Sequence, residues 1–239
     1  MKIFINNRNW LTYPKAMAEQ FANQNHEIIF IDNESTYQPL LDYYNDCKFE
    51  VIKCANLGGQ TAWRANIVND LNEYYVVTDP DYDLSMIPED WPEVLIEGLD
   101  RFLNVNKVGL SWDESKVPPE NPAWIADEFY KYPEGNPLTW GHPLPNNFWH
   151  YPCDTSFAVY RPRTPFRIEG VRKGRPYTGI HIPWHFVLEE SKTEGKLSVI
   201  FNDEILYYFE HCLGAHEGGW SFTKGRMLEM INEYKNKNF

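Results

Sequence analysis

Three carboxylates stand at alternate positions in VVTDPDYD, namely Asp79, Asp81 and Asp83. The residues before them, 74–78, follow the pattern of a buried strand, and we expect it to end at Asp79 because Pro80 cannot donate to a sheet ladder. Alternate residues of an extended segment point to the same side, where carboxylates repel unless a cation or a proton lies between them. Mn²⁺ or Mg²⁺ would suit this position, since such ions take one or two carboxylates together with phosphate oxygens and water.

A simpler interpretation of the acidic stretch is a solvated turn that caps the following helix, because Asp and Ser are common at such positions. On the residues of this stretch alone, both interpretations stay open. Apolar runs predict strands over 2–6, 27–32, 49–54 and 74–79, and amphipathic stretches predict helices over 12–23, 37–46 and 59–71. Strands that are apolar on both faces and alternate with helices predict an α/β fold with a doubly wound, mostly parallel sheet flanked by helices.

Polar residues follow each predicted strand of this first half. In open α/β sheets, ligands bind outside the carboxyl ends of the strands, so these residues are candidates to contact a ligand. They are Asn6 and Asn7 after the first strand, Asp32 and Asn33 after the second, Asn56 with Gly58 and Gly59 after the third, and Asp79 and Asp81 after the fourth.

The second half has a different character. Residues 113–152 are rich in Pro and Trp, which predicts an ordered, loop-rich aromatic wall packed on the sheet. A strand is expected over 154–161 and two helices over 202–213 and 223–236. The basic sequence VRKGR, 171–175, is interpreted as a solvated patch or a mobile lid with glycine hinges. With no internal repeat and no sharp boundary, residues 1–239 are expected to form a single domain.

Composition limits the classes of partner. The formal net charge of -12 repels phosphate backbones and anionic lipid, so nucleic acid is not expected and any membrane association would be peripheral. The four cysteines form no CxxC pair and the first residues lack the apolar stretch of a signal peptide, which predicts free thiols and a cytoplasmic location.

The sequence resembles the GT-A (Rossmann-like) glycosyltransferases in three segments: IIFIDNEST at 28–36, NLGGQTAWRAN at 56–66 and VVTDPD at 76–81. The resemblance covers about residues 1–110 and implies a nucleotide-sugar-binding half, followed by an acceptor-binding half over 111–239. It implies a metal-dependent enzyme that moves a sugar from a UDP- or GDP-type donor to a glycan or related acceptor. Asp32 and Asn33 would lie near the base or ribose, and the DxD at Asp79 and Asp81 would carry the metal.

The second half is similar to short bacterial or viral glycosyltransferases in DTSFAVYR and GRPYTGIHIPWH. The resemblance implies that His181 completes the metal site or touches the diphosphate. His185 lies four residues on, but Pro183 argues against a helix that would pair the two for zinc, and we expect His185 to be structural.

Two further roles follow from the chemistry of transfer. If the reaction inverts, a carboxylate must accept the proton of the acceptor hydroxyl, and Asp154 is the candidate, with a turn-capping role as the alternative and Glu169 in reserve. The sequence lacks a clear ED pair, which leaves the base and the stereochemistry open. Arg64 is the expected cationic contact of the donor diphosphate, with the cluster Arg172, Lys173 and Arg175 as the alternative.

Three other functions are considered. An aspartyl-phosphate phosphatase would place Thr or Val where Asp83 stands and would carry its motif after the first strand. A nucleotidyltransferase would open with a glycine-rich basic loop, whereas FINNRNWLTYP has no glycine. A non-catalytic carbohydrate-binding protein would explain the aromatic residues but not the carboxylates at the strand end.

Overall fold

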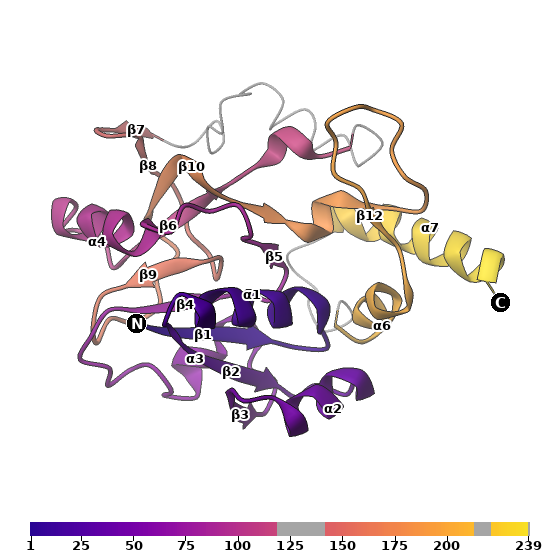
Figure 1. Cartoon of the computed structure of the whole chain (residues 1–239), viewed down its shortest axis with the longest axis horizontal. Helices are drawn as coiled ribbons and strands as arrows, with labels where there is room; N and C mark the ends of the chain where they lie inside the picture. Colours follow the sequence, from indigo (N-terminus) through magenta and orange to yellow (C-terminus); the bar gives the residue numbers. More distant parts are fainter. Residues whose placement is uncertain (119–141, 213–220, 239) are drawn as a thin grey trace.

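The computed structural model describes residues 1–118, 142–212 and 221–238, and they form a ten-stranded sheet with helices around it (Figure 1). Nine strands follow the order β3-β2-β1-β4-β9-β6-β10-β8-β7, and β5 pairs with β10. The strands are β1 (Lys2–Asn7), β2 (Glu27–Asn33), β3 (Glu50–Cys54), β4 (Tyr75–Thr78), β5 (Tyr82–Asp83), β6 (Lys107–Trp112), β7 (His142–Leu144), β8 (Phe148–His150), β9 (Ala158–Tyr160) and β10 (Val171–His181). Strands β11 (Phe186–Val187) and β12 (Val199–Ile200) form a separate parallel pair.

Six α-helices and three short 3₁₀ turns accompany these strands in the described residues. The helices are α1 (Thr12–Asn23), α2 (Gln38–Asp46), α3 (Thr61–Arg64), α4 (Trp91–Arg101), α6 (Asp203–Cys212) and α7 (Ser221–Asn238). The turns are η1 (Gly58–Gln60), η2 (Glu114–Lys116) and η3 (Ile182–His185). None of the helices in the described ranges is long and apolar enough to cross a membrane.

Both faces of the sheet are covered, which explains why the first strands are apolar on both sides. Side chains alternate between the faces: Ile3 and Ile5 of β1 enter one core, and Phe4 enters the other. The first core receives α1, α2 and α4, and the second receives α3. A third cluster joins α6, α7 and η3 around the buried Trp10, so the C-terminal segment packs against the residues that follow β1.

The prediction of an α/β fold with a sheet flanked by helices is confirmed. Strands β3, β2, β1 and β4 are parallel, as expected of the first half. The complete sheet also contains antiparallel pairs, because β9 runs antiparallel between β4 and β6, and β8 runs antiparallel to β10. Strands β6 and β10 still run in the direction of β4, so their carboxyl ends lie at the same edge.

Three local predictions were wrong in whole or in part. The strand predicted over 154–161 is limited to β9, Ala158–Tyr160. The helix predicted over 59–71 is only η1 and the four-residue α3, because Asn66 takes a left-handed backbone conformation with φ of 57° and ends the helical run. The predicted lid at 171–175 is the first half of the sheet strand β10, where Arg172 is fully buried. Most of the expected aromatic wall, 119–141, lies outside the described residues. The thiols of Cys47, Cys54 and Cys153 are free, as predicted.

Candidate functional site

The acidic turn after β4 is tied to the segment that leads into β9. The backbone N–H of Asp79 donates to the carbonyl oxygen of Thr155 at 3.0 Å, and the Thr155 hydroxyl donates to Asp79 Oδ2 at 2.7 Å. Strand β4 ends at Thr78, one residue before the predicted end, and Pro80 follows where a ladder donor would be needed. Thr155, which sequence reasoning did not select, therefore fixes the first carboxylate of the motif.

Asp81 and His181 meet at the carboxyl ends of β4 and β10. His181 Nε2 lies 3.4 Å from Asp81 Oδ2, and the N–H of Ile182 donates to the Asp81 carbonyl oxygen at 2.9 Å. The Asp81 side chain is buried, and its Oδ1 accepts no hydrogen bond from the described residues. A buried carboxylate oxygen left without a partner is costly, so this position suits a cation or a hydrogen-bond donor from a ligand.

Negative charge is concentrated around Asp79. Burial raises the pKa of Asp79 well above its usual value, and the nearby carboxylates Asp81 and Asp154 raise that pKa further. The hydrogen bond from Thr155 and the positive charge of Lys107 oppose this rise without cancelling it. A bound cation would favour the ionised form, so the local electrostatics are those of a carboxylate pair that binds a metal or retains a proton.

The predicted metal ligands lie near one another but do not form a group that could hold a metal by itself in the described residues. Asp81 and His181 are in contact, and Asp79 is electrostatically coupled to Asp81. Across the described ranges, no three His, Cys, Asp or Glu side chains gather closely enough to hold a metal by themselves. Such an ion characteristically takes only one or two carboxylates and completes its shell with substrate oxygens and water. The Oδ1 of Asp81 has no hydrogen-bond partner among the described residues.

Asp154 precedes β9 and presents an exposed carboxylate, with 57% of its side chain accessible. Its Oδ1 accepts a hydrogen bond from the N–H of Ser156 at 3.0 Å and lies 3.7 Å from Arg172 Nη2. Desolvation works to raise the pKa of Asp154, but the Arg172 guanidinium and the Ser156 hydrogen bonds outweigh it and lower the pKa. Asp154 is thus a carboxylate at neutral pH, with one oxygen held and the other, Oδ2, without a hydrogen bond to the described residues.

Two buried cations lie beneath Asp154. Sequence reasoning placed one of them, Arg172, in a solvated patch or lid and did not select the other, Lys107. Arg172 of β10 and Lys107 of β6 are each 0% exposed. Lys107 Nζ donates to the Asp154 carbonyl oxygen at 2.7 Å, and burial lowers the pKa of Lys107 to about 8. Local sequence gives no signal for either residue, because their burial depends on strands that pair across long stretches of chain.

The predicted donor-binding residues surround the turn after β3. Asn33 Oδ1 accepts hydrogen bonds from the N–H of Leu57 and the hydroxyl of Thr61, and Asn33 Nδ2 donates to the Gly58 carbonyl oxygen. Asn56 Oδ1 accepts the N–H of Gly58 at 3.1 Å. Asn33 and Asn56 therefore shape the turn. Gly58 supports it with a left-handed φ of 76°, which glycine adopts without steric cost.

This turn also reaches β1 and the acidic residues. Asn6 Nδ2 donates to the carbonyl oxygen of Gly59 at 3.2 Å, which leaves the buried Asn6 Oδ1 as an acceptor without a partner among the described residues. Gly59 in turn packs against Thr155, because a Cβ at Gly59 would lie 3.1 Å from Thr155 Oγ1. The ends of β1, β3 and β4 thus form one continuous rim, in which Asn6, Gly59, Thr155 and Asp79 are linked by direct contacts.

Other predicted residues have mainly local partners. Asn7 is fully buried and donates to the Trp10 carbonyl oxygen and the Tyr44 hydroxyl, while its Oδ1 has no partner in the described part of the chain. Asp32 Oδ1 accepts the N–H of Ser35 at 3.1 Å. Arg64 is exposed, and its Nη1 donates to the Leu57 carbonyl oxygen at 2.8 Å, beside the turn after β3.

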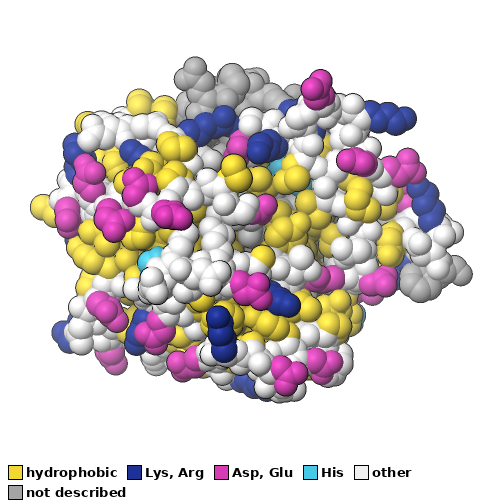
Figure 2. All heavy atoms as spheres, in the orientation of Figure 1, with side chains coloured by type: hydrophobic (Ala, Val, Ile, Leu, Met, Phe, Trp, Pro, Cys, Tyr) yellow, Lys and Arg dark blue, Asp and Glu magenta, His cyan; other side chains and the backbone are white. Residues whose placement is uncertain are grey.

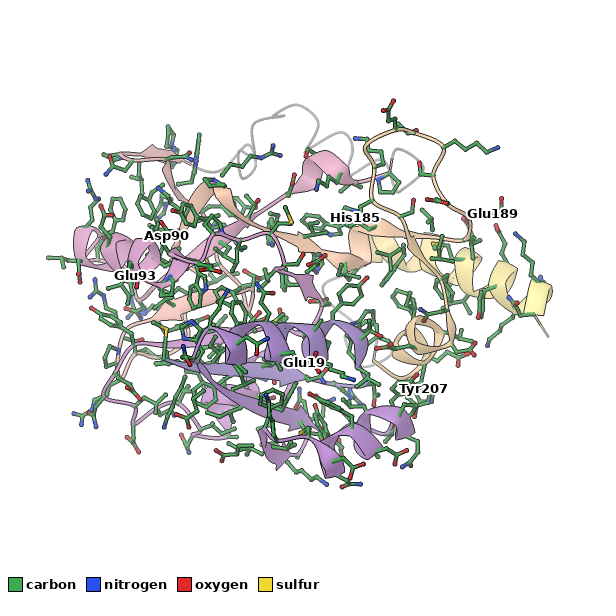
Figure 3. The ribbon with its side chains drawn as sticks, viewed as in Figure 1. Glu19, Asp90, Glu93, His185, Glu189 and Tyr207 are labelled. Carbon is green, nitrogen blue, oxygen red and sulfur yellow. The ribbon has the colours of Figure 1, made fainter. Side chains whose placement is uncertain are left out.

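The remaining candidates separate clearly. The third carboxylate of the motif, Asp83, lies in β5 and accepts the N–H of Ser85 in a local turn. His185 is fully buried and its Nδ1 donates to the Leu197 carbonyl oxygen, in agreement with a structural role (Figure 3). Glu169, the reserve base, precedes the amino end of β10, whereas Asp79 follows the carboxyl end of β4. The segment around Glu169 pairs with the residues directly before Asp154, because the N–H of Cys153 donates to the Ile168 carbonyl oxygen at 2.8 Å.

The surface does not concentrate one sign of charge on the face shown in Figure 2, where acidic side chains are interspersed with basic and apolar ones. The fold and the rim together define an α/β protein with a polar, acidic site at the carboxyl edge of its sheet. Comparison with protein-family models found no match, and comparison with curated proteins found no similar sequence.

Proposed function

We propose that this protein is a metal-dependent glycosyltransferase of GT-A architecture, which moves a sugar from a nucleotide-diphosphate donor to a hydroxyl of a glycan or related acceptor. The observation that carries the proposal is the continuous rim from Asn6 through Gly59 and Thr155 to Asp79. Three sequence segments that resemble this class, 28–36, 56–66 and 76–81, end at or surround that rim. Carboxyl-edge rims are the usual ligand sites of open α/β sheets.

Asp79 and Asp81 would hold Mn²⁺ or Mg²⁺, and His181 would assist. The ion would neutralise the diphosphate that leaves when the sugar is transferred. Donor contacts would come from Asn6, Asn7, Asp32, Asn33, Asn56 and Arg64, with Arg64 as the cationic contact. The unpartnered oxygens of Asn6 and Asn7 favour ligand groups that donate hydrogen bonds, such as ribose hydroxyls or the N–H groups of a base.

Asp154 would act as the base of an inverting transfer. Its Oδ2 is free to accept the proton of the acceptor hydroxyl while that oxygen forms the new bond to the anomeric carbon and the bond to the diphosphate breaks. The lowered pKa keeps the carboxylate ionised at neutral pH. The anomeric configuration of the product, measured by NMR, tests this role: retention of configuration would remove Asp154 from it.

Calorimetry with UDP, GDP and their sugar conjugates, with and without Mn²⁺, tests the function itself. The proposal expects one nucleotide family to bind only with the metal. Asp81→Asn should abolish this binding while the fold remains intact. Asp83→Asn is the matched control, because it removes a carboxylate two residues away whose hydrogen bond is to the N–H of Ser85 in a local turn. The affinity of the Asp83→Asn variant for the nucleotide should equal that of the wild type. Absence of metal-dependent nucleotide binding in the wild type would refute the proposal.

A further inference from the structure

Arg172 is buried to an extent that its sequence context does not suggest. It lies in VRKGR, yet its side chain is 0% exposed in β10. Each nitrogen of the guanidinium donates a hydrogen bond: Nε to the Pro152 carbonyl oxygen at 3.0 Å, Nη1 to the Leu110 carbonyl oxygen at 2.6 Å, and Nη2 to the Ser156 hydroxyl at 2.9 Å. The guanidinium carbon also lies 4.1 Å from the centre of a Trp112 ring. The head group is therefore fixed in position and orientation.

The charge of Arg172 is directed at Asp154. Arg172 Nη2 lies 3.7 Å from Asp154 Oδ1, and the same oxygen accepts the N–H of Ser156. The Ser156 hydroxyl accepts from Arg172, so Ser156 connects the cation and the carboxylate through both its backbone and its side chain. The Lys107 ammonium holds the Asp154 carbonyl oxygen from below. Asp154 is thus exposed, yet its carbonyl oxygen is bonded to Lys107 of β6, and its Oδ1 is bonded to the Ser156 N–H within ion-pair distance of Arg172.

Stability alone does not account for this arrangement. Desolvating a guanidinium costs several kcal/mol, and a buried ion pair is often no more stabilising than apolar side chains of similar volume. Lysine could not replace the planar fork of donors, since its ammonium is a single point charge on a flexible stem. What the arrangement supplies is a fixed direction for an otherwise exposed carboxylate, and catalysis depends on such preorganisation.

We propose that Arg172, acting with Ser156, is a positioning residue that holds Asp154 Oδ1 so that Oδ2 faces the acceptor. The proposal rests on the proposed transferase function, in which Asp154 accepts the acceptor's proton. Arg172 does not touch the substrate. Its loss should therefore slow the transfer step and leave metal-dependent donor binding unchanged.

The test compares Arg172→Lys and Ser156→Ala with the wild type and with Arg161→Lys. Arg161 is the matched control, because it also donates to two backbone carbonyl oxygens, those of Val105 and Leu99, and it follows the end of β9 whereas Asp154 precedes the start. Misplacing Asp154 should lower kcat on the order of 10²-fold in Arg172→Lys, with KM for the donor unchanged. Ser156→Ala should lower kcat in the same direction, and Arg161→Lys should keep the wild-type kcat.

Two results would overturn the inference. The first is a kcat in Arg172→Lys equal to that of the wild type. The second is a decrease in kcat that is fully explained by a smaller fraction of folded protein, as expected if Arg172 has only a structural role. If the wild type neither binds a nucleotide nor transfers a sugar, the proposed function fails. Crystal structures of the wild type and Arg172→Lys then test separately whether Arg172 positions the Asp154 carboxylate. Displacement of the Asp154 carboxylate in the variant would support it, and an unmoved carboxylate would exclude it.

Discussion

The buried imidazole of His185 makes the stability of this protein sensitive to acid. His185 is 0% exposed, its Nδ1 donates to the Leu197 carbonyl oxygen at 3.1 Å, and its Nε2 has no hydrogen-bond partner among the described residues (Figure 3). Burial lowers the pKa of His185 from 6.5 to about 4. The folded protein therefore keeps the ring neutral over a pH range in which the unfolded chain is protonated.

The sign of the effect follows from proton binding. Between about pH 6.5 and pH 4 the unfolded chain binds more protons at this site than the folded protein, so the free energy of unfolding falls as the pH is lowered through that window. The stability is fully present above the unfolded pKa. With these pKa values, the contribution lost between pH 7.5 and pH 5 is roughly 2 kcal/mol, and it approaches roughly 3 kcal/mol near pH 4.

Urea unfolding of the wild type and His185→Asn at pH 7.5 and pH 5 measures this contribution. Asparagine can still donate to the Leu197 carbonyl oxygen but does not titrate, so the variant should lose roughly 2 kcal/mol less than the wild type on acidification. Any cavity left by the smaller side chain lowers stability equally at both pH values and cancels in the comparison. Equal losses in the two proteins would show that His185 is not the acid-sensitive group.

Three further predictions concern packing and buried charge. Glu204 of α6 accepts hydrogen bonds from the N–H groups of Leu11 and Thr12 at the start of α1. Glu204→Ala should therefore lower the free energy of unfolding in urea by about 1–2 kcal/mol. Glu189→Ala, which changes an exposed side chain, should leave the urea midpoint unchanged. Gly98→Ala should lower the free energy of unfolding by about 1–3 kcal/mol, because the added Cβ would lie 2.7 Å from Cε1 of the buried Phe148. Differential scanning calorimetry measures this loss, and an unchanged melting temperature would mean that the Phe148 ring can move aside. The free energy of unfolding of the wild type should rise between about pH 8 and pH 10.5, because in this range the unfolded chain retains a proton that Lys107 has lost in the folded protein. Lys107→Met should flatten this rise. Equal slopes of the free energy of unfolding against pH in the two proteins would contradict the lowered pKa of Lys107.

Much of the first half of the fold could be predicted from the sequence because its signals are local. Helix α1 occupies the predicted range 12–23, and β1 to β4 lie within a residue or two of the predicted strands. Apolar periodicity and the missing N–H of Pro80 act over a few residues, so they can be recognised without tertiary information. The predicted helix over 59–71 failed for a similarly local reason, the left-handed backbone at Asn66, which residue type alone did not reveal.

The candidate site could be predicted only in part. Sequence spacing indicated Asp79 and Asp81 at a strand end and His181 late in the chain, but the partners that define their chemistry come from distant segments. Thr155 contacts Asp79 across 76 residues, and Arg172 reaches Leu110 across 62. Such contacts depend on which strands become neighbours, and short apolar strands such as β9 carry little information about their partners.

By itself, then, the sequence determined where the parallel strands of the first half begin and end, and that polar and acidic residues follow them, since these properties depend on periodicity and on single side chains. Tertiary structure decided which of those residues meet. Insertion of β9 between β4 and β6 brings Thr155 to Asp79, and the pairing of β10 with both β6 and β8 buries Arg172 beneath Asp154. The electrostatic state of a carboxylate depends on its surroundings in space, so the difference between Asp79, with its raised pKa, and Asp154, with its lowered pKa, arises only in the folded protein.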